Sequence, residues 1–136
     1  IGIVQLKKLK TCLKLKEQIA KRYDKNFLNF EEVQTPFIPS YVNQHSWYCY
    51  TIKVKKKFRN KLIKYLKKND IETRLSFPPV HIQPYYKNRI KFNKFELKNS
   101  LKTYNEFLDI PIWPTMKIST QKKVIKTILN FFNYSN

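Results

Sequence analysis

The chain has 136 residues, which suits one domain with a single moderate core and excludes separate cofactor and substrate domains in the same chain. It carries a formal net charge of +19, which points to a polyanionic partner. A single glycine and nine scattered acidic residues exclude a Gly-rich phosphate loop and an acidic metal cluster.

The segment from Ile3 to about Asn29 repeats apolar residues at steps of three, four or seven with lysines between them, which predicts a long amphipathic helix. At 1.5 Å per residue this helix would be roughly 40 Å long, so we expect part of it to pack on something outside this chain. The opening residue Ile1 already reads as the middle of a helix, and we expect a fragment. The repeating positions are Leu6, Leu9, Leu13, Ala20, Tyr23 and Phe27.

A loop with two prolines is expected over residues 31–43. Apolar and polar residues then alternate over 47–54, which predicts a strand. A short helix begins near Phe58 and ends near Asp70, a residue type that tolerates the left-handed position after a helix. A second strand is predicted over 71–77.

Prolines interrupt residues 78–93, for which we expect an irregular loop with at most one helical turn. A further helix is predicted over 97–108, and a brief strand over 110–112. Ser119 is expected to cap a last helix, whose apolar stripe is Val124, Ile128 and Phe131.

The order of a long helix followed by strand, helix, strand, helix, strand and helix predicts an α/β fold of the two-layer α+β kind. Helices should pack on one face of a small sheet. We find no internal repeat and expect one domain over residues 1–136.

The chain has no leader-like segment and no apolar run approaching 18 residues, so we expect a soluble, cytoplasmic protein. Cys12 and Cys49 lie far apart without zinc-type spacing, which favours reduced structural thiols and no metal. No nucleophile with a base and no paired carboxylates are visible, and we expect the chain alone to be inactive.

The most suggestive stretch is IETRLSFPPVHIQPYY, residues 71–86, which places Arg74, His81, Tyr85 and Tyr86 around a proline-stiffened loop at a strand end. In the functional interpretation Arg74 meets an anionic group, and His81 or a tyrosine hydroxyl donates to a polar ligand. In the alternative, Arg74 is an ordinary surface cation, His81 is a satisfied imidazole and the tyrosines belong to the core.

Alternating cations and aromatic residues over 85–95 would also suit single-stranded nucleic acid. However, 24 of the 28 basic residues are lysine, whereas recognition of bases and phosphates favours arginine. Asn, Ile, Phe and Tyr are abundant as well, and we attribute most of the charge to an AT-biased coding sequence. A nucleic-acid partner is therefore not expected.

Four segments together resemble the C-terminal region of the DegT-type sugar aminotransferases. IGIVQLKKL at 1–9 looks like the helix that crosses between the family's two domains, and HSWYCYTIKV at 45–54 looks like the first small-domain strand. The stretch 71–86 looks like the substrate-side loop, and IPIWPTMKISTQKKVIKTI at 110–128 looks like the last strand and helix. Their order and spacing make the joint match specific.

The resemblance implies the C-terminal domain of a fold-type I enzyme, with residues 1–30 as an interdomain helix and 31–136 as a small α/β domain. It implies a pyridoxal phosphate-dependent enzyme that moves an amino group from an amino acid, typically glutamate, to a nucleotide-linked keto-sugar in surface polysaccharide biosynthesis. The catalytic lysine and the cofactor site would lie in a large domain outside this chain, so no cofactor is expected on the chain itself.

Carried across by position, His81, Arg74 and Tyr85 are the implied substrate-binding residues. The family is generally dimeric, so a homodimer is implied for the parent enzyme. The sequence departs from the family at Asp70, where glycine is usual between helix and strand. Two alternatives stay open, a basic nucleic-acid-binding module and a non-catalytic regulator with the same fold.

Overall fold

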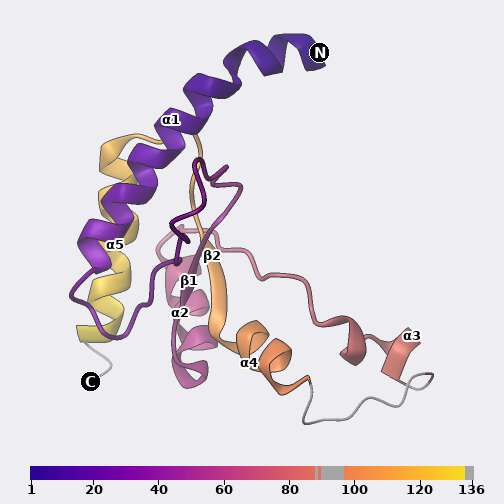
Figure 1. The fold of residues 1–136 in the computed structure, drawn as a ribbon. Coiled ribbons are helices and arrows are strands. Elements are labelled where there is room, and N and C mark those ends of the chain that lie inside the picture. Colours follow the sequence, from indigo (N-terminus) through magenta and orange to yellow (C-terminus); the bar gives the residue numbers. More distant parts are fainter. Residues whose placement is uncertain (88, 90–96, 134–136) are drawn as a thin grey trace.

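The computed structural model describes residues 1–87, 89 and 97–133. Helices dominate it, and two short strands lie at its centre (Figure 1). In chain order the elements are α1 (Gly2–Phe27), β1 (Tyr50–Lys53), α2 (Lys56–Lys68), the 3-10 turn η1 (Val80–Ile82), α3 (Pro84–Lys87), α4 (Lys98–Glu106), β2 (Phe107–Ile110) and α5 (Ile118–Asn133).

The two strands pair antiparallel, with Thr51 directly opposite Asp109 and Ile52 opposite Leu108. Single bridges extend the pair on both sides, from Gln34 to Lys53 and from Arg74 to Asp109. Because side chains alternate across a strand, one face carries the buried Ile52 and Leu108, while the other carries Thr51 and Asp109. The predicted α/β fold of helices around a small sheet is confirmed.

The strands are shorter than predicted. The strand expected over 47–54 begins only at Tyr50, because Trp47 has a φ of 48° and the chain turns there. The strand expected over 71–77 is wrong except for the bridge at Arg74. After that bridge the chain leaves the sheet towards a pair of prolines, whose nitrogens cannot donate to a ladder.

Boundaries in the last third also differ. The helix expected over 97–108 ends at Glu106, and the strand expected over 110–112 lies instead at Phe107–Ile110. Pro111 follows this strand directly and cannot donate a ladder hydrogen bond. The last helix begins at Ile118, so Ser119 lies inside its first turn and is not the cap.

The segment 78–93 contains two short helical turns, η1 and α3, where at most one was expected. Pro79 precedes the first and Pro84 begins the second, and a proline at the start of a helical turn needs no backbone donor. Residues 88 and 90–93 of this prediction lie outside the described residues.

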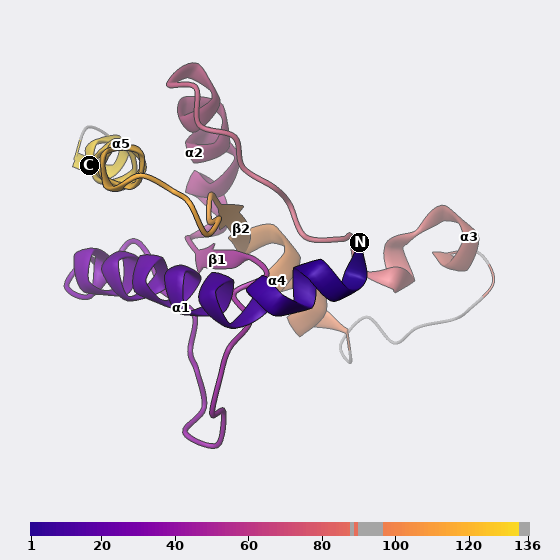
Figure 2. The same ribbon diagram turned by 90° about the horizontal axis from the view of Figure 1, so that it is seen from above.

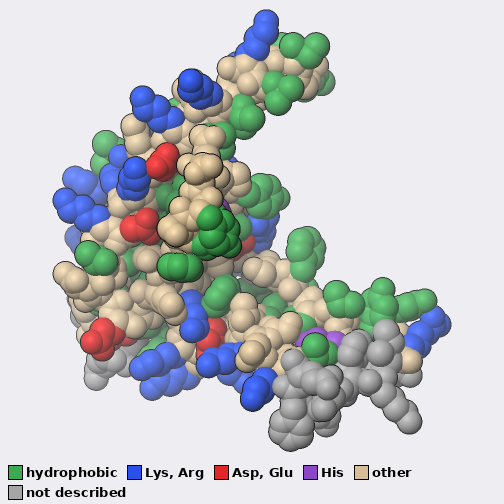
Figure 3. Space-filling model, in the orientation of Figure 1, with side chains coloured by type: hydrophobic (Ala, Val, Ile, Leu, Met, Phe, Trp, Pro, Cys, Tyr) green, Lys and Arg blue, Asp and Glu red, His purple; other side chains and the backbone are tan. Residues whose placement is uncertain are grey.

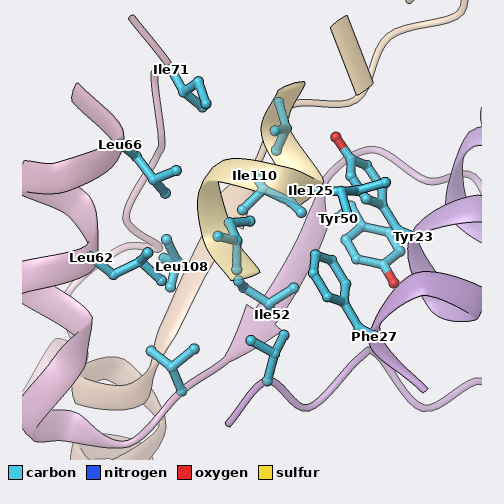
Figure 4. Close-up of a cluster of buried hydrophobic side chains, with 14 of the residues drawn as sticks. Tyr23, Phe27, Tyr50, Ile52, Leu62, Leu66, Ile71, Leu108, Ile110 and Ile125 are labelled. Atoms are coloured by element: carbon cyan, nitrogen blue, oxygen red, sulfur yellow. The ribbon is translucent and has the colours of Figure 1, made fainter. Parts of the chain in front are cut away.

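One buried cluster joins the helices to the strand pair. Figure 4 shows leucines of α2 on one side of Ile52 and Leu108, and the rings of α1 on the other. Helix α5 packs against α2 through edge-to-face ring pairs such as Phe58 with Phe132, whose centroids lie 5.5 Å apart. The largest fully buried apolar side chains are Tyr23, Tyr50, Phe27, Phe132, Ile19, Ile52, Leu62, Leu66, Leu108 and Ile128.

Polar contacts fasten α1 to the rest of the body. The buried Gln121 of α5 donates to the Ile19 carbonyl at 2.7 Å and accepts from Arg22 Nε at 2.7 Å. Tyr23 donates its hydroxyl to the Pro111 carbonyl at 2.8 Å, and Tyr50 donates to Asp24. Burial raises the pKa of both tyrosines well above the ordinary value, and for Tyr50 the bond to Asp24 adds to the shift.

The long helix predicted from Ile3 to about Asn29 is confirmed, but only its second half is packed. Residues 1–11 are all exposed, whereas Ile19, Ala20, Tyr23 and Phe27 are buried. This first half projects beyond the body, on the same side as the segment that leads to α3 (Figures 1 and 2). Packing of this half on something outside the chain stays a prediction, and its exposure among the described residues is consistent with it.

The turn after α2 is a Schellman motif built on an aspartate. Asp70 has a φ of 58°, and its N–H donates to the Lys67 carbonyl at 3.1 Å, while the Ile71 N–H donates to the Leu66 carbonyl at 3.0 Å. Leu66 and Ile71 are both buried, which supplies the apolar contact of this motif. Asp70 thus occupies the left-handed position for which glycine is the usual residue.

Candidate functional site

An open groove of about 850 Å³ runs between the polar face of the strand pair and the start of α5. Its size lies within the range of small-molecule sites, which is roughly 300–1,000 Å³. Its walls come from the residues just before β1, the segment 70–74, the end of β2 and the turn into α5. Side chains that line it include Tyr48, Arg74, Asp109, Trp113, Ser119 and Lys123.

Arg74 is the predicted site residue that the structure places in this groove. Its Nε donates to Asp109 Oδ2 at 3.0 Å, and its Nη1 donates to the Tyr48 hydroxyl at 3.4 Å. The guanidinium carbon also lies 5.1 Å from the centre of the Tyr48 ring. The bonds to Tyr48 and Asp109 raise the pKa of Arg74 above its usual value, so the guanidinium stays charged.

Asp109 lies beneath Arg74 and is almost completely buried, with its side chain 7% exposed. Its Oδ1 accepts from the Thr51 hydroxyl at 2.6 Å, and its Oδ2 accepts from Arg74. The backbones of Arg74 and Asp109 also exchange two hydrogen bonds, of 3.1 and 2.8 Å. Thr51, Asp109 and Arg74 therefore form a row across the sheet, in which both carboxylate oxygens have a partner.

The far wall of the groove is provided by Trp113 and by the first turns of α5. Trp113 is 41% exposed and Lys123 is exposed, so an indole face and an ammonium group are both available to a ligand. The groove thus combines aromatic surfaces and two cations with the carboxylates of Asp70, Glu72 and Asp109. An anion would therefore be bound through the N–H groups of Arg74 and not through a net positive charge of the groove.

The other two predicted site residues lie elsewhere. His81 is half-buried in η1, and Tyr85 is 61% exposed in α3; neither lines the groove. Both belong to residues 75–87, here called the arm, which leads away from the strand pair (Figure 1). Arg89 lies over the Tyr85 ring at 4.1 Å. Within the described residues, the three predicted site residues are therefore not gathered in one pocket.

Sequence reasoning missed Asp109, Tyr48 and Trp113. Asp109 carried a faint signal, because it is an acid between Leu108 and Ile110 in a chain with few acids. Its link to Arg74 and Thr51 depends on strand register, which the sequence does not supply.

The described residues do not by themselves fit pyridoxal phosphate. The pyridine nitrogen of the cofactor pairs with a carboxylate held inside a pocket, but the buried Asp109 already accepts from Thr51 and Arg74. The other groove carboxylates, Asp70 and Glu72, are exposed. The single glycine, Gly2, lies on the projecting half of α1 with open space around it, so it forms no phosphate cradle. Among the residues that the structure describes, no three His, Cys, Asp or Glu side chains gather as metal ligands.

Within the described part of the chain, none of the helices combines the length and the apolar character that crossing a membrane requires.

The fold is a helix-flanked strand pair with an open groove beside its polar face, and comparison with known proteins specifies the family. The model of the DegT/DnrJ/EryC1/StrS aminotransferase family matches residues 1–129. The chain therefore belongs to this aminotransferase family, as its sequence predicts.

Two curated relatives illustrate the match. The chain is 37% identical over 120 residues to an uncharacterized protein of Methanocaldococcus jannaschii, covering 85% of this chain and 31% of the relative. It is 32% identical over 133 residues to the spore coat polysaccharide biosynthesis protein SpsC of Bacillus subtilis, covering 94% and 34%. The chain thus spans about a third of the length of these relatives.

Solved structures share the fold. The aminotransferase TlmJ of Streptoalloteichus hindustanus superposes with a TM-score of 0.89 at 21% identity, over 98% of this chain and 35% of that one. Helicobacter pylori PseC, an aminotransferase of pseudoaminic acid biosynthesis, gives 0.86 at 19% identity, over 98% and 36%. The predicted fold, that of part of a fold-type I aminotransferase, is confirmed.

Proposed function

We propose that this chain is the small-domain part of a pyridoxal phosphate-dependent sugar aminotransferase. The whole enzyme would transfer an amino group from an amino acid, with glutamate as the typical donor, to a nucleotide-linked keto-sugar. The observation that carries the proposal is the family match, which covers residues 1–129 of this chain. The chain itself spans only about a third of the length of its relatives. A cytoplasmic enzyme of surface polysaccharide biosynthesis is the proposed setting, in keeping with the name of the Bacillus subtilis relative.

The exposed apolar surfaces of the chain support its assignment to two parts of that enzyme. Residues 1–30 are proposed as the helix between the two domains, and 31–136 as the small domain. Leu6 is 69% exposed and Phe77 is 97% exposed, although both are apolar. Figure 3 shows such apolar side chains on the projecting end of α1 and along the arm, on either side of a concave face. A large domain that holds the cofactor would cover these surfaces.

Arg74, His81 and Tyr85 are proposed as substrate-binding residues at two places on the small domain. Arg74 would meet the diphosphate of the nucleotide-sugar in the groove. His81 and Tyr85 would approach the sugar from the arm once the large domain, and the second subunit of a homodimer, complete the cleft. The cofactor is assigned to the rest of the enzyme because this chain spans only about a third of the length of its relatives.

The test is the absorbance spectrum of the full-length parent protein with pyridoxal phosphate, with this chain as the control. We expect a band near the visible region in the parent alone, lost on borohydride reduction, because the lysine that forms it lies outside this chain. Addition of glutamate should then convert the band, and other amino acids tested in parallel identify the donor. The absence of a band in the parent would refute the enzyme and leave a non-catalytic member of the family.

The site residues are tested by steady-state kinetics of the parent enzyme. Arg74→Ala and His81→Ala should raise KM for the nucleotide-sugar and leave KM for the amino donor unchanged, since both residues are proposed to contact the sugar substrate. Lys64→Ala, on the exposed side of α2, is the matched control. Equal kinetics for all three variants would contradict these assignments.

A further inference from the structure

The guanidinium of Arg74 is held on two sides before any ligand arrives. Asp109 occupies Nε, and the Tyr48 hydroxyl occupies one N–H of Nη1. A guanidinium carries five N–H groups in a rigid fork, so these contacts leave about three of them for a ligand. The Arg74 side chain is 57% exposed and lines the groove, which keeps the remaining N–H groups accessible.

The carboxylate that holds Arg74 is itself fixed. Asp109 is 6% exposed, lies opposite Thr51 in the strand register, and accepts the Thr51 hydroxyl on its other oxygen. Tyr48 holds the guanidinium from its outer side, with its ring 5.1 Å away. An arginine held in this way loses little side-chain entropy when an anion binds, which favours affinity through preorganisation.

We propose that Asp109 and Tyr48 are positioning residues that aim the remaining N–H groups of Arg74 into the groove to bind an oxyanion. The oxyanion is the diphosphate of the nucleotide-linked substrate, an assignment that rests on the proposed function. Neither residue touches the diphosphate in this scheme; each acts through Arg74. Lys123 on the opposite wall adds a second positive charge, whereas Asp70 and Glu72 also line the groove, so the directed N–H groups of Arg74 carry the binding.

Asp109 has two opposing effects on an anion in the groove. They distinguish a residue that positions Arg74 from one that acts only through its negative charge. Its negative charge repels the anion, whereas its hydrogen bond orients Arg74. Asparagine keeps an oxygen for Arg74 Nε without the charge, while alanine removes both. Positioning therefore predicts that Asp109→Ala weakens anion binding and that Asp109→Asn restores it.

The experiment is calorimetric titration of inorganic pyrophosphate, and separately of UDP, into the whole 136-residue chain at physiological salt. We expect Asp109→Ala to weaken pyrophosphate binding by roughly tenfold, the effect of losing one charge-assisted contact, and Asp109→Asn to bind at least as tightly as the wild type. Thr51→Ala removes the hydrogen bond that fixes Asp109 but leaves the contact between Asp109 and Arg74 in place. It should therefore weaken pyrophosphate binding less than Asp109→Ala does.

Tyr48 tests the proposal without risk to folding, because its side chain lies on the surface at 73% exposure. Tyr48→Ala should weaken pyrophosphate binding several-fold, and Tyr48→Phe, which keeps the ring over Arg74, should weaken it less. Lys64→Gln removes one positive charge from α2 and controls for the overall charge of the chain.

The proposal is overturned if Asp109→Ala binds pyrophosphate as tightly as the wild type or more tightly, or if the wild type shows no binding that depends on Arg74. Should Asp109→Ala fail to fold, an unchanged affinity of Tyr48→Ala overturns it. Failure here is distinct from failure of the proposed function, because the cofactor band of the parent enzyme does not depend on pyrophosphate. If the parent enzyme shows the cofactor band but the variants do not change the affinity for pyrophosphate, only the positioning role is refuted.

Discussion

The two halves of α1 carry the same kind of apolar repeat in different surroundings. Tyr23 and Phe27 in the second half are completely or almost completely buried against the strand pair and α5. Leu6 and Leu9 in the first half are 69% and 47% exposed. The periodicity of a sequence therefore specifies which face of a helix is apolar, but it does not specify whether the partner of that face belongs to the same chain.

The largest expected difference in the free energy of unfolding is between leucine-to-alanine substitutions in the packed body and in the projecting half of α1. Leu62→Ala in α2 removes a side chain with 0% exposure and should lower the free energy of unfolding by about 2–5 kcal/mol. Leu6→Ala removes the same atoms from an exposed position and should change it by less than about 0.5 kcal/mol. Urea denaturation followed by circular dichroism measures both, and similar losses would mean that α1 is packed along its whole length in solution.

A second comparison concerns the polar contact that holds α5 on α1. Gln121→Ala removes an amide that is 1% exposed and serves both Ile19 and Arg22, so the free energy of unfolding should fall by about 1–3 kcal/mol. Gln5→Ala, in the projecting half, should fall within about 0.5 kcal/mol of the wild type. If Gln121→Ala proved neutral, apolar packing alone would hold the two helices together.

Much of the fold could be predicted because the apolar spacing of a helix is visible in a short stretch of sequence. The long first helix and the helices around Leu62, Leu101 and Val124 all follow from apolar spacing. The strands were placed less well, since each is only four residues long and proline or a left-handed residue sets its ends. The sequence does not distinguish the packed half of α1 from the projecting half, because burial depends on which other elements contact the helix.

The candidate site could be predicted only in part, for a related reason. Arg74 was identified from its place beside a strand end, and the structure sets it in a groove. Asp109 and Tyr48 reach it from positions 35 and 26 residues away in the chain, through strand pairing that local patterns do not encode. His81 and Tyr85 lie near Arg74 in the sequence, but neither lines the groove. The arm that contains them leads away from the strand pair (Figure 1).

The buried tyrosines of the body provide a pH-dependent contrast. Burial raises the pKa of Tyr23 above its unfolded value of 10.0, so its contribution to stability is complete below pH 10 and is lost as the pH rises towards the folded value. Above pH 10, Tyr23→Phe should therefore lose stability less steeply than the wild type, by up to about 1.4 kcal/mol per pH unit. Urea denaturation at several pH values tests this, with Tyr41→Phe as a control for loss of an exposed hydroxyl. Parallel curves for Tyr23→Phe and the wild type would show that Tyr23 is hydrated in solution.

The smallest expected effect concerns Asp70, where an exposed residue governs how a packed helix ends. Its φ of 58° is a conformation that glycine adopts freely and that an L-residue with a side chain resists. Its carboxylate also lies at the negative end of the α2 dipole. Asp70→Gly should therefore raise the free energy of unfolding by about 0.5–1 kcal/mol.

Asn69 is the matched control for that substitution, because its φ is −104° and offers glycine no conformational advantage. Asn69→Gly should lower the stability, because it increases the chain entropy of the unfolded state and removes the hydrogen bond from Asn69 Nδ2 to the Tyr65 carbonyl at 2.9 Å. Opposite signs at two adjacent positions would show that the left-handed backbone of Asp70, and not general flexibility of the turn, limits stability there. Equal effects would contradict a specific role for the left-handed backbone of Asp70.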